Sequence, residues 1–509
     1  MTIEKKEICL WLLKKDFRVE DNPALCLALE NHAEVHPLFI LEPSALIAPE
    51  TSNHHIQSWF CALDELNTIL SDSNSKVPIV YGEYIQTLEI LKKSHIITHI
   101  YAHEEIGSSR TYKRDLLLIQ WCEENDVVFT ELMQTGVFRR LKDRDKRSTK
   151  WHDWMNGWSK DLTSKDLSRL SWLKGTQLQL LNDDQAKSRC TEFRASFKTS
   201  TRIQKVGPIS AQKCLDSFLY KRVKAYSSGL SSPNSAFSVC SRLSTHLAWG
   251  AVSPRTVINH TRWRMEEVLH TGEEDVGTWR KSLNAFKARM SWRDHFIQRL
   301  ESEPSMEFYS LNRAFDKFPF NKDHEMLQKW IEGETGFPLV DACIKCATKT
   351  GYLNFRMRCM ITSLACHVMH LDWRDIMWPM ARWWSDYEPG IHIAQLQMQA
   401  GTVGINTLRI YNPAKQILDH DPEAKFIKRW LPELKNIDVQ DIYLHQYHPG
   451  SFYIEPVVDY QMAIVMMRSE YYQISRTDEA REIKTSVLKK HGSRKRVKKK
   501  RVISKVDKK

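Results

Sequence analysis

The first 135 residues contain five short apolar runs separated by longer stretches of polar or helical-period sequence. The runs lie at residues 8–13, 35–41, 77–81, 96–102 and 127–132, and stretches such as SNHHIQSWFCALDELNTILSD lie between them. Strands that alternate with helices indicate βαβ units, which build a parallel, doubly wound sheet. We therefore predict an α/β fold with a five-stranded parallel sheet for residues 1–135.

The turn after the first apolar run reads KKDFRVEDNPAL and is not glycine-rich. Doubly wound sheets bind ligands beyond the carboxyl ends of their strands, where a nucleotide is usually accompanied by G-x-G-x-x-G or a P-loop. Neither motif follows the first run, so no nucleotide site is predicted there by motif.

The strand pattern disappears from about residue 206, where long amphipathic stretches such as SLNAFKARMSWRDHFIQRLE take over. Apolar residues at helical spacing predict an all-helical second domain over residues 206–480. Residues 136–205 are polar and lack a clear period, which is typical of an interdomain connection. Residues 481–509 form a basic tail that we expect to be disordered.

The formal charge of +12 is concentrated at the C-terminus, where residues 489–509 hold twelve Lys or Arg and one Asp. The rest of the chain is therefore nearly neutral, and a basic surface on the folded body would require clustering. The tail is interpreted either as a solubilising end or as an arm for nucleic-acid contact or nuclear import.

Eleven cysteines without a secretory signal indicate reduced thiols, and no run of about 18 apolar residues is present to cross a membrane. We expect a cytoplasmic protein, or a nuclear one if the organism is eukaryotic. Cys343 and Cys346 form a CIKC pair inside a helical pattern that continues to Cys359 and Cys366. A redox CxxC pair normally opens a helix that follows a strand, and a metal site usually draws on a knuckle or a second chain segment. Neither holds for the CIKC pair, so no metal site is expected.

Arg356 and Arg358 stand two residues apart in the otherwise apolar stretch TGYLNFRMRCM. Buried charges need partners, and the nearby segment DWRDIMWPMARWWSDYEPGIH supplies carboxylates. The segment CSRLSTHLAWGAVSPRTV places hydroxyl groups before an apolar helix, which suits a diphosphate or an ordinary helix cap. The segment MSWRDHFIQRLE has an aromatic and basic face that either stacks on a base or packs in a core.

These segments, together with EGETGFPLVDACIKC and RIYNPAKQILDHDPEAKFIKRWLPEL, occur across residues 8 to about 435 in an order that resembles the photolyase/cryptochrome flavoprotein family. The resemblance implies an α/β antenna domain joined to a helical domain that binds FAD. It also implies DNA repair, in which light-excited reduced flavin passes an electron to a flipped-out pyrimidine dimer. The alternatives are a cryptochrome-like photoreceptor without repair activity and a light-independent flavoprotein that binds nucleic acid.

The resemblance also assigns residues to the FAD by position. The FAD phosphates and ribityl chain would contact Tyr226, Cys240, Ser241, Arg242, Leu243 and Ser244. The flavin would lie along Asp386, Tyr387 and Glu388, with Arg356 paired to Asp386 beside its reactive edge. His392 takes the position nearest flavin N5, which is Asn in many photolyases, Asp in plant cryptochromes and Cys in animal ones. We expect His392 either to donate a proton to an anionic flavin radical and titrate near neutral pH, or only to form a hydrogen bond with the backbone.

The lesion pocket departs from the family pattern. Arg289 replaces the Glu that stands three residues before the stacking tryptophan, Trp292. Phe355 and Cys359 replace the Asn and Met of enzymes for cyclobutane dimers, and they also differ from the His pair of the (6-4) branch. Met398 replaces the second pocket tryptophan. The lesion type therefore stays open, as does the choice of single- or double-stranded DNA.

The family's chain of three tryptophans, which photoreduces the flavin, is also altered. Only the middle member, Trp373, matches, while Leu396 and Phe320 take the inner and outer positions. Other candidates for electron transfer are Trp378, Trp383, Trp384 and Tyr387, for which core packing is the alternative. A second antenna chromophore would be a folate, a deazaflavin or a flavin, or would be absent. We expect the protein to be a monomer.

Overall fold

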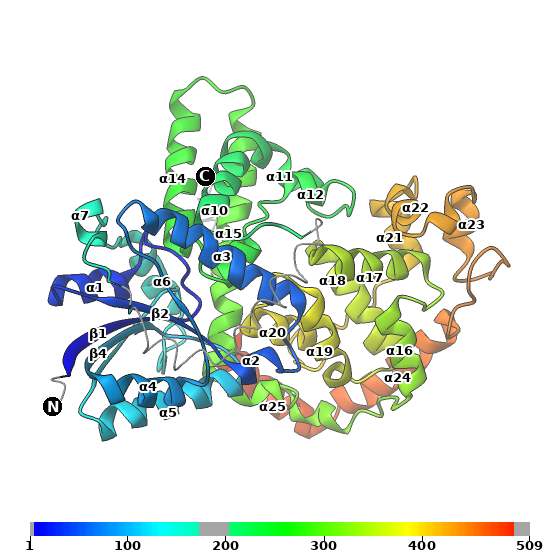
Figure 1. Ribbon diagram of the computed structural model, residues 1–509. Coiled ribbons are helices and arrows are strands. Elements are labelled where there is room, and N and C mark those ends of the chain that lie inside the picture. The colour runs from blue at the N-terminus through cyan, green and yellow to red at the C-terminus, as the bar shows by residue number, and fades with distance from the viewer. Residues whose placement is uncertain (1–4, 172, 174–202, 493–509) are drawn as a thin grey trace, which may run out of the picture.

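A five-stranded parallel sheet forms the N-terminal part of the computed structural model, which describes residues 5–171, 173 and 203–492 (Figure 1). The strand order is β3-β2-β1-β4-β5 and every neighbouring pair is parallel. The strands are β1 (Lys6–Leu13), β2 (His36–Leu41), β3 (Ile79–Tyr81), β4 (His95–His103) and β5 (Val128–Leu132). The predicted sheet is confirmed, and each strand overlaps its predicted apolar run.

Helices cover both faces of the sheet, and the side chains of β1 alternate between the two cores that these helices form with it. Ile8, Leu10 and Leu12 pack in one core with α4 and α5, while Trp11 and Leu13 pack in the other with α1 and α3. The helices of this domain are α1 (Pro23–Asn31), α2 (Pro43–Leu46), α3 (Asn53–Ser71), α4 (Tyr84–Ser94) and α5 (Ser109–Glu124).

The segment after β5 contains α6 (Arg147–Asn156) and α7 (Ser164–Leu167). α6 contacts α14 (Pro254–His270) of the second domain. Its Trp151 is buried and donates through Nε1 to Asp294 Oδ2 at 2.8 Å. The described part of this connection is therefore packed against the helical domain.

Between residues 203 and 492 the described chain is helical, apart from a single bridge between Asn321 and Leu371, which confirms the predicted helical domain. Its first half comprises α10 (Pro208–Ser217), η1 (Phe218–Arg222), η2 (Val223–Ala225), α11 (Tyr226–Gly229), α12 (Ala236–Val239), α13 (Ser244–Ala248), α14 (Pro254–His270), α15 (Val276–Ser302), η3 (Pro304–Glu307), η4 (Arg313–Lys317) and α16 (His324–Glu332). Its second half comprises α17 (Pro338–Thr350), α18 (Phe355–Ser363), η5 (Leu364–Val368), α19 (Trp373–Trp383), α20 (Pro389–Gln399), α21 (Pro413–His420), α22 (Lys425–Trp430), η6 (Pro432–Leu434), α23 (Val439–Leu444), α24 (Tyr460–Ser475) and α25 (Asp478–His491).

The two domains meet along the turn after β1. Arg255 on α14 forms a buried ion pair with Asp21 at 2.6 Å, and Arg18 Nη1 donates to the Gly250 carbonyl at 3.0 Å. Gly250 has a left-handed backbone, and a Cβ on it would lie only 1.9 Å from the Lys15 carbonyl oxygen. This close approach of backbones fixes the position of one domain on the other.

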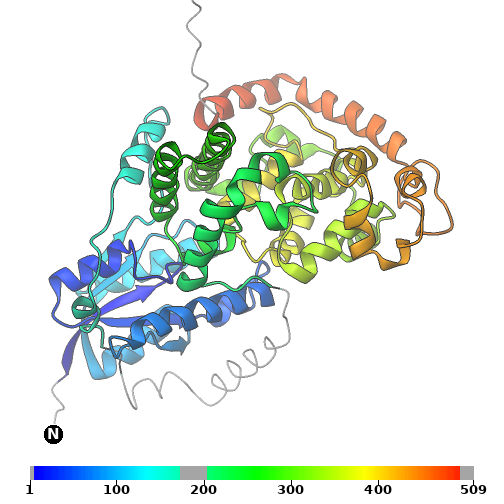
Figure 2. The same ribbon diagram turned by 90° about the horizontal axis from the view of Figure 1, so that it is seen from above.

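Two predictions about helix extent are wrong. The stretch from Cys343 to Cys366 is not one helix, because α17 ends at Thr350 and Gly351, with a φ of 69°, turns the chain before α18 begins. Residues 481–491, assigned to a disordered tail, belong to α25, which runs along the rim of the helical domain (Figure 2). Residues 493–509 lie outside the described residues.

The ten cysteines in the described ranges are all free thiols. None of the helices in this part of the chain combines the length and the apolar character that a transmembrane span requires.

Candidate functional site

Asp386 and Arg358 form a partly buried ion pair where α18 faces the loop between α19 and α20. Arg358 Nη1 and Nη2 donate to Asp386 Oδ1 and Oδ2 at 3.0 and 3.1 Å, and Arg358 Nε donates to the Leu353 carbonyl at 2.7 Å. The guanidinium carbon lies 4.1 Å from the centroid of the Trp384 ring. Burial alone would raise the pKa of Asp386, but the Arg358 charge and the Ser244 hydroxyl hold it below its ordinary value.

The expected pairing of Arg356 with Asp386 is therefore wrong. α18 begins at Phe355, and side chains two residues apart on an α-helix point about 200° apart around its axis. Only one of the two arginines can reach Asp386, and Arg356 leaves its buried Nε without a partner among the described residues. Sequence reasoning gave Arg358 no role; the helical phase counted from the N-cap, Asn354, is the signal that could have found it.

The segment 240–244, expected at the FAD phosphates, runs from the end of α12 into α13. Arg242 in this segment has a left-handed backbone with a φ of 61°. Its guanidinium carbon lies 3.5 Å from the centroid of the Tyr352 ring, and its buried Nη1 has no partner among the described residues. Because Ser244 bonds Asp386, this segment and the Arg358 ion pair belong to one connected region.

The other residues expected at the phosphates lie in the same region. Leu243 and Tyr226 are buried, whereas Cys240 and Ser241 are half-buried. Burial raises the pKa of Tyr226 to about 12, and its side chain bonds Arg289 on α15. The structure thus brings a residue assigned to the cofactor into contact with one assigned to the lesion pocket.

Several buried polar atoms in or beside these segments lack a partner within the described chain. They are Arg242 Nη1, Ser227 Oγ, Asn354 Oδ1 and Tyr387 Oη. Buried polar atoms are normally hydrogen-bonded, so a group of unpaired ones is available to bond a ligand. Their mixture of N–H, hydroxyl and carbonyl groups fits a molecule that carries phosphates, hydroxyls and a heteroaromatic ring, as FAD does.

His392 is buried on α20 and bonds the Met377 carbonyl through Nε2 at 2.8 Å. Burial lowers the pKa of His392 to about 4, although the carbonyl and Asp386 favour the charged form. The expectation that His392 titrates near neutral pH is therefore wrong, and the backbone-bonding alternative describes its contact. Tyr387 lies 5.4 Å from His392 between ring centroids, and burial raises its pKa well above the ordinary value.

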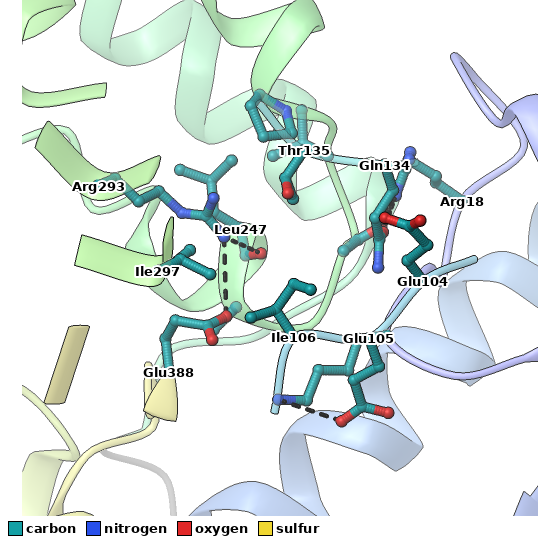
Figure 3. Close-up of a pocket in the computed structure, with 15 residues that line it drawn as sticks. Arg18, Glu104, Glu105, Ile106, Gln134, Thr135, Leu247, Arg293, Ile297 and Glu388 are labelled. Atoms are coloured by element: carbon teal, nitrogen blue, oxygen red, sulfur yellow. Dashed lines mark hydrogen bonds and ion pairs between the residues drawn. The ribbon is translucent and has the colours of Figure 1, made fainter. Parts of the chain in front are cut away.

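Glu388 lies at the junction of the two domains, beside a small cavity of about 30 Å³ (Figure 3). Arg293 on α15 approaches Glu388 at 3.8 Å and donates to the Leu247 carbonyl at 3.2 Å. Burial raises the pKa of Glu388 even though Lys15 and Arg293 oppose this shift. A larger hollow of about 420 Å³ opens between α3, α10 and the turn after β1.

The residues expected in the lesion pocket differ in exposure. Trp292 and Phe355 are 41% and 49% exposed, which is high for aromatic side chains, and Arg289 is exposed as well. Met398 is half-buried. Cys359 is buried, and its burial raises the pKa of the thiol to about 12, so it does not present a reactive group at a surface.

Three tryptophans form a buried row behind the Arg358 ion pair. The ring centroids of Trp384 and Trp383 are 6.0 Å apart, and those of Trp383 and Trp330 are 4.9 Å apart. Trp373 is fully buried and its Nε1 donates to the Ser310 hydroxyl at 3.3 Å. Trp330 received no role from the sequence, because only the three-dimensional packing places α16 beside α19.

Two family models match this chain. The model described as DNA photolyase matches residues 9–165, and the model described as the FAD binding domain of DNA photolyase matches residues 286–476. The first covers the parallel sheet. The second covers α18, α20 and the loop that carries Asp386, so the helical domain is an FAD-binding domain of the photolyase type.

Characterised proteins of two kinds resemble the chain to a similar degree. A deoxyribodipyrimidine photo-lyase of Alkalihalophilus pseudofirmus is 25% identical over 454 residues, covering 85% of this chain and 88% of the relative. Cryptochrome-2 of Arabidopsis thaliana is 24% identical over 525 residues, which cover 94% of this chain and 80% of that relative. Among solved structures, an archaeal photolyase from Sulfolobus tokodaii, described with two FAD molecules, is 24% identical and has a TM-score of 0.73. The match covers 92% of this chain and 100% of the archaeal one.

Proposed function

The chain belongs to the photolyase/cryptochrome family, and from this premise we propose that it repairs ultraviolet-induced pyrimidine dimers in DNA under blue light. FAD, when bound, supplies the light absorption and the single electron that this reaction requires. The exposed tryptophan Trp292, three residues from the exposed Arg289 on α15, is the observation that carries the proposal. An accessible aromatic face beside a positive charge suits a base next to a phosphodiester backbone.

The residues proposed to hold FAD fall into two groups. Arg242, with its unpaired Nη1, would bind the diphosphate together with Tyr226 and the hydroxyls of Ser241 and Ser244; Cys240 and Leu243 complete this wall. Asp386, Tyr387 and Glu388 would line the flavin, with Arg358 keeping Asp386 ionised and fixed in position. His392, which its lowered pKa keeps neutral at pH 7, would line the flavin site as a polar side chain and would not act as a proton donor.

A second candidate function is a blue-light photoreceptor without repair activity. The observation that favours it is the state of the lesion-reading positions: Cys359 is buried, and Phe355 offers no hydrogen-bonding group. The buried row Trp384–Trp383–Trp330 provides closely spaced aromatic rings for electron transfer, although core packing alone also explains these contacts.

The deciding experiment illuminates the purified, reduced protein with single- and double-stranded oligonucleotides that contain one cyclobutane dimer or one (6-4) product. Restored bases are counted for wild type, for Trp292→Ala and for Trp263→Ala, a matched control on α14 whose side chain is 58% exposed. We expect repair that Trp292→Ala abolishes and Trp263→Ala keeps. Absence of repair of both lesions, with light-driven flavin reduction intact, would favour the photoreceptor.

The proposal includes a monomer, in the cytoplasm or a eukaryotic nucleus, and a second chromophore in or beside the N-terminal domain. The 420 Å³ hollow has the size of small-molecule sites and is lined by apolar residues such as Ile69 and Val252, with Lys213 also in its wall. Absorbance of the chromophores extracted from the purified protein would identify a folate, a deazaflavin or a flavin. Analytical ultracentrifugation would test the monomer.

A further inference from the structure

A cluster of basic side chains gathers where α6, α15 and the end of α25 meet. His295 on α15 is its centre: Arg144 Nη2 lies 2.6 Å from His295 Nδ1, and Arg299 Nη2 lies 3.4 Å from His295 Nε2. Arg147, on α6, and His491, at the end of α25, are close enough to act electrostatically on His295. The cluster thus collects guanidinium and imidazole groups from three distant segments of the chain.

The contacts of His295 are chemically incomplete. A neutral imidazole has one N–H donor and one acceptor nitrogen, whereas a guanidinium group has donors only. The shorter contact, from Arg144, takes the acceptor, so the remaining N–H of His295 faces the donor of Arg299. Protonation would worsen the arrangement, and burial together with the neighbouring arginines lowers the pKa of His295 to about 2. An acceptor is missing between His295 and Arg299.

Two of the arginines also carry unpaired donors. Arg299 and Arg147 are only 5% and 4% exposed. Nε and Nη1 of Arg299, and Nε of Arg147, are buried without a partner among the described residues. Burial, with the Arg144 charge, lowers the pKa of Arg299 to about 10, and burial also lowers that of Arg147 to about 10. A buried guanidinium without a counter-ion is costly, so the structure is short of negative charge here.

The nearby carboxylates leave the unpaired donors of Arg299 and Arg147 unsatisfied, although Asp294 attracts Arg147 electrostatically and Glu303 bonds His491. Asp294 accepts from Trp151 Nε1 at 2.8 Å and from Arg293 Nη1 at 2.7 Å. Glu301 accepts from the Arg140 backbone N–H at 2.7 Å, and Glu303 binds Lys490 and the Ser305 hydroxyl. In the described part of the chain, neither Arg299 nor Arg147 lies within ion-pair distance of a carboxylate.

We propose that this cluster, made of Arg144, Arg147, His295, Arg299 and His491, binds a small tetrahedral oxyanion of the phosphate class. Such an anion accepts several N–H bonds at once and matches the planar fork of an arginine. The burial of Arg299 and Arg147 favours a small free anion over a phosphate that is part of a DNA backbone. The partly buried Arg144 would be the side chain that moves to admit it. The site lies on the face of α15 that also carries Trp292, whose ring centroid is 5.3 Å from that of His295.

Inorganic phosphate is the probe. The unfolding temperature of the full-length protein is measured in rising phosphate and in chloride at equal ionic strength, and the dissociation constant is measured by calorimetry. We expect saturable stabilisation by phosphate in wild type. Arg299→Met should weaken phosphate binding about tenfold or more, because it removes charged N–H donors. Arg481→Met, which changes an exposed arginine on α25, is the matched control and should leave binding unchanged.

A second variant keeps the test decisive if Arg299→Met folds poorly. His295→Glu would place a carboxylate between Arg144 and Arg299 and so supply the missing acceptor from the chain itself. This variant should unfold at a higher temperature than wild type without phosphate and should gain nothing from phosphate. Equal unfolding temperatures of wild type in phosphate and in chloride would overturn the proposal. Stabilisation by an undamaged oligonucleotide but not by phosphate, if lost in Arg299→Met, would overturn the small-anion assignment in favour of a backbone phosphate.

Discussion

Arg358 and Arg356 differ in what their removal would leave behind. Replacing Arg358 by Met would strand the Asp386 carboxylate, which is only 7% exposed, and leaving a buried charged acceptor without its partner costs about 2 kcal/mol or more of unfolding free energy. Arg356→Met removes a side chain that forms no ion pair within the described chain, so its cost should stay below about 1 kcal/mol. Urea titrations of both variants measure the difference. Equal losses would contradict the assignment of Arg358 as the partner.

His392 should make the stability of the protein depend on pH in the acid range. Its pKa is lowered to about 4 by burial, whereas an unfolded histidine has a pKa of about 6.5. Between these values only the unfolded chain binds the proton, so the contribution of His392 is fully present above about pH 6.5 and is lost as the pH falls toward 4. In His392→Asn the loss of unfolding free energy between pH 6.5 and 4.5 should be smaller by about 2 kcal/mol.

The measurement for His392 is a series of urea titrations across that pH range. Other buried histidines, such as His55 and His246, also have lowered pKa values and stay in both proteins, so they cancel in the comparison. Parallel pH profiles of wild type and His392→Asn would show that His392 is already protonated in the folded protein or is accessible to solvent.

At the scale of single residues, the sequence predicted which residue types gather but not which of them touch. A carboxylate partner for an arginine of the stretch TGYLNFRMRCM was predicted, and Asp386 is that partner. The choice between Arg356 and Arg358 depends on where α18 begins, and a shift of two residues reverses the side of the helix on which each lies. The pKa of His392 was not predictable for a related reason, because depth of burial lowers this pKa and is not a property of the motif.

Gly250 should tolerate substitution far less well than another glycine of similar backbone conformation. A Cβ at Gly250 would lie 1.9 Å from the Lys15 carbonyl oxygen, whereas one at Gly272 would meet nothing within 4 Å. Their φ angles are 64° and 69°, so Gly272→Ala reports the backbone strain alone, about 1 kcal/mol. Gly250→Ala should cost several kcal/mol more, since the backbones of two domains must separate. Unfolding free energies of the two variants that agreed within error would disprove this tight contact.

Among the elements, the five strands were predictable because short apolar runs bounded by polar sequence leave few alternatives to a buried strand. The residues at which helices begin and end were less predictable. The continuous apolar pattern between Cys343 and Cys366 conceals the break at Gly351, whose left-handed backbone shows only in three dimensions. The lysines near residue 489 made α25 read as part of a basic tail, although Thr477 caps its first turn by accepting from the Ala480 N–H.

Positive charge is concentrated in two places in the molecule, one buried in the fold and one in the sequence after α25. The cluster around His295 is buried and needs a counter-ion of its own, whereas residues 493–509 hold ten Lys or Arg and one Asp in a segment beyond α25. Lys490 and His491, at the end of α25, both approach Glu303 just after α15. The end of α25 therefore lies beside the end of the helix that carries Trp292 and Arg289 (Figure 2).

Ending the chain at Gly492 should weaken binding to undamaged DNA without unfolding the protein. The truncation removes the ten basic residues but keeps α25 and its ion pair with Glu303, so the unfolding temperature should stay constant. Each lysine or arginine that neutralises a backbone phosphate steepens the salt dependence of log K by about 0.9, so the truncated protein should show a flatter slope. Fluorescence anisotropy at several salt concentrations measures both quantities. A weaker affinity with an unchanged slope would mean that the segment acts without contacting phosphates, and an unchanged affinity would leave DNA binding entirely to the folded body.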